Sequence, residues 1–102
     1  MTNENLFQKA LDMCPAEIQI RFNYINDLLC DTNDEVYECF TNIQKLEVDE
    51  EVLEKINDFF EIAKVNRERV NLQRKLEYLE AKEDILEDMF DEMLLNILAN
   101  LD

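Results

Sequence analysis

The pattern that decides the fold lies in residues 18–46, which read IQIRFNYINDLLCDTNDEVYECFTNIQKL. Steps of four and three residues alternate through it, at Ile18, Phe22, Ile25, Leu29, Thr32, Val36, Cys39, Ile43 and Leu46. This spacing places side chains on one face of an α-helix. The polar residues 31–34 do not interrupt the steps. The pattern therefore predicts one helix over about residues 15–46, starting at Pro15, because helices accept proline in their first turn.

The composition favours an all-helical chain of one domain over residues 1–102. The 102 residues include no glycine and one proline. Because glycine supplies the positive φ of tight turns, β-hairpins and phosphate-binding loops are disfavoured. A content of 47% apolar and 34% charged residues is typical of long helices and coiled coils.

Two further helices are expected. Apolar residues between Leu6 and Leu11 suit a short helix over about residues 4–13. The segment VDEEVL, residues 48–53, resembles a helix start, with Asp49 as the N-cap and with Val48 and Leu53 as a hydrophobic staple. A last helix over about residues 50–98 would then follow a tight turn at residues 46–49. The predicted fold class is all-α, a short N-terminal helix followed by a long antiparallel helical hairpin.

The core of this hairpin is expected along the facing stripes of its two helices. In the last helix, the stripe from Leu53 to Ala63 and the stripe from Val65 onward differ in register, so we expect a change of winding near residues 63–72. The predicted hairpin core comprises Ile18, Phe22, Ile25, Leu29, Val36, Ile43, Leu53, Ile56 and Phe60.

These boundaries also predict a dimer. The last helix would outrun its partner by about 25 Å, at 1.5 Å per residue. The resulting overhang, which runs to Leu101, is apolar, and the short first helix would cover only part of it. We therefore expect a second copy or a partner helix to bury Leu72, Leu76, Leu79, Leu86, Phe90, Met93 and Ile97.

The charge distribution points to protein partners with basic surfaces. The net charge is −15, which disfavours direct binding of nucleic acid or of anionic membranes. One basic island interrupts the acidic sequence. It either pairs with acidic segments of a second chain and helps to set the register, or it is a solvated band. The island consists of Lys64, Arg67, Arg69, Arg74 and Lys75.

Catalytic, metal and cofactor chemistry is not expected. The chain has no histidine, and its three cysteines do not match a zinc-ligand spacing. The odd cysteine count and the lack of a secretion signal favour a reducing intracellular compartment. Cys39 falls on the apolar stripe and is predicted to be buried. Carboxylate pairs such as Glu83 and Glu87 are expected to form a solvated face, so the sequence predicts a protein that is not an enzyme.

One motif resembles a known family. The spacing of Pro15, Glu17, Ile18, Gln19, Phe22, Ile25 and Leu28 is similar to a motif in the N-terminal domain of the inhibitor of growth (ING) family. In this chain Cys14 replaces the leucine before the proline. The segment ERVNL, residues 68–72, resembles a second family segment.

The resemblance implies a helical hairpin that homodimerises as an antiparallel coiled coil. It also implies attachment to histone acetyltransferase or deacetylase complexes in the nucleus. The family's C-terminal histone-reading finger needs a Cys/His zinc-ligand set, which this sequence lacks. Histone-tail reading therefore does not carry over, and the chain would be either an excised domain or a short member.

Two other interpretations stay open at this point. A small acidic protein, for example a viral one, could mimic DNA and inhibit a nucleic-acid-binding enzyme. Its binding would weaken steeply with salt. A generic coiled-coil adaptor would share the predicted fold and differ only in its partners.

Overall fold

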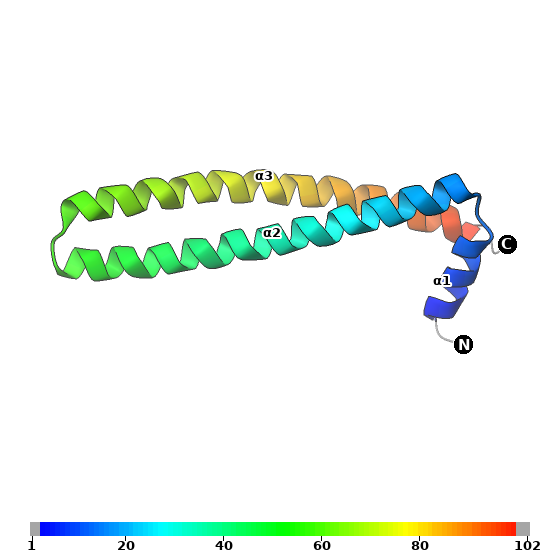
Figure 1. Cartoon of the computed structure of the whole chain (residues 1–102), viewed down its shortest axis with the longest axis horizontal. Helices are drawn as coiled ribbons and strands as arrows, with labels where there is room; N and C mark the ends of the chain where they lie inside the picture. The colour runs from blue at the N-terminus through cyan, green and yellow to red at the C-terminus, as the bar shows by residue number, and fades with distance from the viewer. Residues whose placement is uncertain (1–2, 100–102) are drawn as a thin grey trace. The chain divides into compact units, whose positions relative to one another are not determined.

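The computed structural model describes residues 3–99 and is all-α. Its three helices are α1 (Asn3–Asp12), α2 (Ala16–Lys55) and α3 (Phe59–Leu98). The predicted fold class, a short helix followed by a helical hairpin, is confirmed (Figure 1). Leu101, the end of the predicted overhang, lies outside the described residues.

The corner between α1 and α2 is held by backbone and side-chain hydrogen bonds. The carbonyl oxygen of Pro15 accepts the N–H groups of Ile18 at 3.0 Å and Gln19 at 3.2 Å, so Pro15 is the N-cap of α2. The Gln19 side-chain amide donates to the carbonyl oxygen of Cys14 at 2.9 Å. Pro15 and Gln19, both members of the motif, thus have local structural roles in this corner.

The turn of the hairpin lies at residues 56–58, and the prediction of a turn at residues 46–49 is wrong. Asn57 has a φ of 56°. Its N–H donates to the carbonyl of Glu54, and the N–H of Asp58 donates to the carbonyl of Leu53, each at 3.2 Å. This pair of bonds is a Schellman motif with Asn57 in the left-handed position. Asparagine tolerates that conformation better than most residues other than glycine, which the chain lacks.

The N-cap of α3 is Asp58, and Asp49 is an exposed residue inside α2. An Asp58 carboxylate oxygen accepts the N–H of Glu61 at 3.3 Å. Asp49 cannot cap a helix here, because a capping residue acts only where a helix starts. The apolar stripe of α2, with its alternating steps of four and three residues, continues past Asp49 through residues 50 and 53. The predicted helix bounds of 15–46 and 50–98 are therefore replaced by those of α2 and α3.

The new bounds remove the predicted overhang, because α2 and α3 each contain 40 residues. They also remove the register change predicted near residues 63–72. The stripe of α3 starts at Ile62 and alternates steps of three and four without interruption as far as Ile97. Ile56 and Phe60, which were predicted to lie in the core, are exposed because they flank the turn.

Within residues 1–31 and 83–102, which form one compact unit, α1 packs against the C-terminal part of α3. The Phe22 ring lies 5.3 Å from that of Phe7 and 5.2 Å from that of Phe90, measured between centroids. The buried cluster comprises Ala10, Leu11, Cys14, Phe22 and Ile97. α1 therefore covers apolar side chains of α3 that the sequence assigned to another chain.

Within residues 32–82, the second unit, α2 and α3 run antiparallel on either side of the turn (Figure 1). Cys39, Ile43 and Leu79 are buried in its core. The Cys39 thiol donates to the carbonyl oxygen of Leu72, with the sulfur 3.2 Å from the oxygen. The predicted burial of Cys39 is confirmed.

Candidate docking surface

The residues predicted to form the core and the interface differ in how deeply the structure buries them. Of the predicted hairpin core, Phe22, Ile25 and Ile43 are buried. Leu29, Val36 and Leu53 are half-buried. The prediction of Ile18 in the core is wrong, because this residue of the first turn of α2 is 39% exposed. Of the predicted interface, three residues are buried within the chain, and the others are half-buried, namely Leu72, Leu76, Phe90 and Met93.

The three buried interface residues are Leu79, Leu86 and Ile97. Their burial within one chain means that no second copy is needed to cover them. The overhang on which the predicted interface rested does not exist. Contact of this stripe with a second chain stays a prediction.

The basic island divides into one paired and four exposed residues. Arg69 occupies a position on the stripe of α3, and its Nε lies 2.7 Å from Oε1 of Glu50 on the stripe of α2. The two side chains are 22% and 18% exposed. Arg69 also donates to the side chains of Asn66 at 2.7 Å and Gln73 at 3.3 Å. The sequence did not predict this pair, because it placed Glu50 in the first turn of the last helix.

The other four cations of the island lie on exposed positions of α3, and none forms an ion pair within residues 3–99. They are Lys64, Arg67, Arg74 and Lys75. They are therefore available to solvent or to an acidic partner.

Large exposed apolar side chains occur on both sides of the hairpin turn. Phe59 is 71% exposed and Phe60 is 91% exposed, and they are the first two residues of α3. Val48 and Val52 lie one helical turn apart on α2, off its buried stripe. We call the exposed set the tip surface, and it consists of Val48, Val52, Ile56, Phe59 and Phe60.

A groove adjoins the tip surface and shares Val52 with it. The groove has a volume of about 280 Å³ and takes its walls from both α2 and α3. Val52, Leu53 and Val65 provide apolar lining, and Asp49 and Glu61 contribute carboxylates. Neither carboxylate has an ion-pair partner in the part of the chain that the structure describes.

The surroundings of the tip surface are strongly acidic. Residues 47–62 contain seven acidic and one basic side chain, a net charge of −6. Most of these side chains are exposed. The tip surface thus combines apolar area with a negative potential, which suits a partner that is both apolar and basic.

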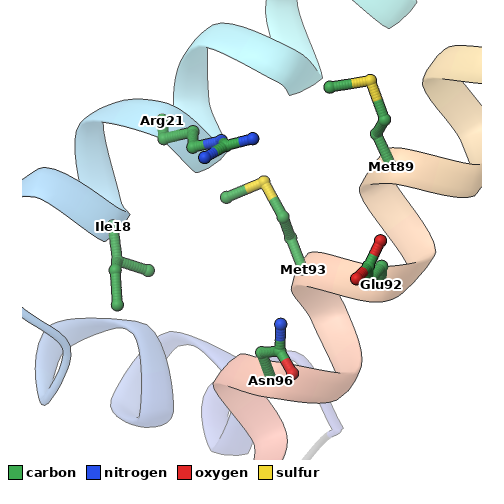
Figure 2. Close-up of a pocket in the computed structure, with 6 residues that line it drawn as sticks. All are labelled: Ile18, Arg21, Met89, Glu92, Met93 and Asn96. Atoms are coloured by element: carbon green, nitrogen blue, oxygen red, sulfur yellow. The ribbon is translucent and has the colours of Figure 1, made fainter.

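A second groove lies between α2 and α3 in the unit of residues 1–31 and 83–102 (Figure 2). Its volume is about 260 Å³. Figure 2 shows Met89 and Met93 extending from α3 on the side facing Arg21 and Ile18. Glu92 and Asn96 complete the lining. Methionine side chains adapt to different shapes, but no buried polar group here selects a ligand.

Neither a metal-ligand group nor a membrane-spanning helix is found among the described residues. No group of three or more His, Cys, Asp or Glu residues between residues 3 and 99 could hold a metal ion. None of the helices in this range is both long and apolar enough to cross a membrane. Comparison with protein-family models, with curated proteins and with solved structures finds no match to this chain.

Proposed function

We propose that the chain is a non-enzymatic scaffold module that binds other proteins through the outer surface of its helical hairpin. The observation that carries the proposal is the tip surface. Its large apolar side chains lie outside the stripes that build the core, and all of them are exposed to solvent. Exposed apolar groups of this kind are typical of sites of protein association.

The resemblance to the ING family supports a more specific form of this proposal. In that form the module homodimerises and links a histone acetyltransferase or deacetylase complex in the nucleus. The support is the spacing of the motif residues from Pro15 to Leu28. Pro15 and Gln19 form hydrogen bonds at the corner between α1 and α2, and these local roles account for their presence in the motif. The motif therefore supports the helical fold more strongly than it supports a chromatin partner.

The high negative charge supports a second candidate, an inhibitor that mimics DNA. A mimic needs carboxylates spaced like phosphates along one surface. The four exposed cations of the basic island interrupt such a surface on α3. The scaffold is therefore the function that we propose first.

The test of the scaffold function is a pull-down of the tagged chain from its source cells at 150 mM and 600 mM salt, with mass spectrometry of the recovered proteins. We expect the same partners at both concentrations, because apolar contacts tolerate salt. Recovery of acetyltransferase or deacetylase subunits would support the chromatin form. Recovery of only DNA-binding enzymes, lost at the higher salt, would overturn the scaffold in favour of the mimic.

Light scattering tests the homodimer separately. We expect the mass of two chains, against 12.2 kDa for one. The exposed cations allow a matched comparison. Arg67→Glu with Arg74→Glu should weaken an antiparallel dimer held partly by the basic island, and Arg67→Lys with Arg74→Lys should not. A mass of one chain at all concentrations up to about 1 mM would exclude the dimer but leave the scaffold function to the pull-down.

A further inference from the structure

We propose that the tip surface docks an amphipathic helix of a partner protein whose apolar stripe is flanked by lysine or arginine residues. This inference rests on the proposed scaffold function and adds the place of binding and the chemistry of the partner. It requires no contribution from a second copy.

The apolar part of the proposal rests on the two phenylalanines. Phe59 and Phe60 are adjacent in sequence and are 71% and 91% exposed, and the exposed Val48, Val52 and Ile56 lie on the end of α2 and in the turn. Aromatic side chains bury a large area on binding and are common among the residues that dominate binding energy. The tip surface therefore has the composition of an anchor for an apolar partner.

The shape of the neighbouring groove favours one helix over a broad globular surface. The groove is formed between α2 and α3, has a volume of about 280 Å³ and contains Val52, Leu53 and Val65. A volume of this size accommodates a few side chains. Side chains spaced at i, i+3 or i+4, and i+7 on one helix can reach such a groove and the apolar residues beside it, as in other helix-in-groove complexes.

The charge of the partner follows from complementarity. Asp49 and Glu61 line the groove without ion-pair partners in the described range. The surrounding residues 47–62 have a net charge of −6. Lysine or arginine beside the apolar stripe of a partner would pair with these carboxylates. A second copy docked through its own tip surface would bring a second charge of −6 to the contact, and an anionic membrane would be repelled for the same reason.

The experiment uses the full chain and a fluorescein-labelled 18-residue peptide of leucine and lysine, patterned as an amphipathic helix. The control peptide has the same composition in an order that does not segregate leucine from lysine. Fluorescence anisotropy in 150 mM salt gives both dissociation constants. We expect the patterned peptide to bind at least tenfold more tightly than the control peptide. Equal binding would mean a purely electrostatic attraction and would overturn the proposal.

Two double variants locate the binding. Phe59→Ser with Phe60→Ser removes the anchors and keeps every charge. Ile20→Ser with Leu95→Ser is the matched control, since these side chains are 69% and 70% exposed and lie in the other unit. All four residues are exposed, so both variants should keep the helical circular dichroism of the parent. We expect the first variant to raise the dissociation constant of the patterned peptide at least tenfold and the second to change it less than twofold.

Other occupants of the tip surface would give other results. Sedimentation of the chain with phosphatidylcholine vesicles, abolished by the two phenylalanine substitutions, would assign the surface to a membrane and overturn the proposal. A decrease in mass caused by those substitutions would assign it to self-association, with the same consequence. If the phenylalanine variant still recovers every partner in the pull-down, the scaffold function stands and only the tip surface is wrongly assigned.

Discussion

The position of the hairpin turn can be tested by removing two aspartates that compete for the role of N-cap. In the structure Asp58 caps α3 by accepting the N–H of Glu61, and Asp49 is exposed inside α2. Asp58→Ala should lose a capping bond worth about 1 kcal/mol and a carboxylate–dipole interaction of about 0.5 kcal/mol. Asp49→Ala should gain about 0.5 kcal/mol, because alanine is the better residue inside a helix. The two variants should differ by about 2 kcal/mol in their free energies of unfolding.

The comparison is well matched, because each substitution removes one carboxylate from a chain of net charge −15. Urea unfolding followed by far-ultraviolet circular dichroism, at one protein concentration, gives the two free energies from the midpoints and slopes. A companion variant, Asn57→Gly, should be at least as stable as the parent, since glycine accepts a φ of 56° without cost. If Asp49→Ala is the more destabilising substitution, the turn lies at residues 46–49, and the boundaries of α2 at Lys55 and of α3 at Phe59 are refuted.

Three further predictions concern packing, pairing and thiol exposure. Ile97→Ala should lower the free energy of unfolding by about 2–5 kcal/mol, whereas Leu95→Ala should change it by less than about 0.5 kcal/mol; similar losses in urea unfolding would contradict the burial of Ile97 beneath α1. Glu50→Leu or Arg69→Leu alone should cost about 1–2 kcal/mol, because each leaves a partly buried charge unpaired, and the double variant should recover most of that loss. A double-mutant cycle measures the coupling, and a value of zero would refute a role for the pair in stability. Cys30 is exposed and the other two cysteines are buried, so a disulfide reagent should modify one thiol rapidly in the native protein; rapid reaction of all three would contradict the packing.

Helix content, the short first helix and most of the buried stripe were predictable from the sequence. The steps of four and three residues located Phe22, Ile25, Cys39 and Ile43, all of which are buried. Periodicity is sufficient for this purpose, because each long helix of a hairpin packs one face against its neighbour and leaves the other face in water. The charged residue in the stripe, Glu50, was not recognised as part of it. A carboxylate can occupy this partly buried position because Arg69 on α3 pairs with it, and only the tertiary structure shows that Arg69 lies opposite.

The tip surface was not predicted, because the turn was expected at residues 46–49 and lies at residues 56–58. With the turn placed at residues 46–49, Ile56 and Phe60 fell inside the last helix and were assigned to its core. A signal was present in Asn57 and Asp58, since both residue types favour turns and caps. The residue pair alone was insufficient, because the same pair also follows Ile25 at residues 26 and 27, where no turn occurs.

The repeated tripeptide Ile-Asn-Asp, at residues 25–27 and 56–58, shows what the sequence determined by itself and what the tertiary structure decided. Local preferences are identical in the two copies, and the sequence determines a chain of amphipathic helices around both. Ile25 lies on the stripe and is 4% exposed, so its burial outweighs the weak helix propensity of the two residues that follow. After Leu53 the next position of the stripe is Asn57, which has no apolar group to bury, and Ile56 is left 65% exposed. The helix therefore continues through the first copy and ends at the second, where packing no longer favours another turn.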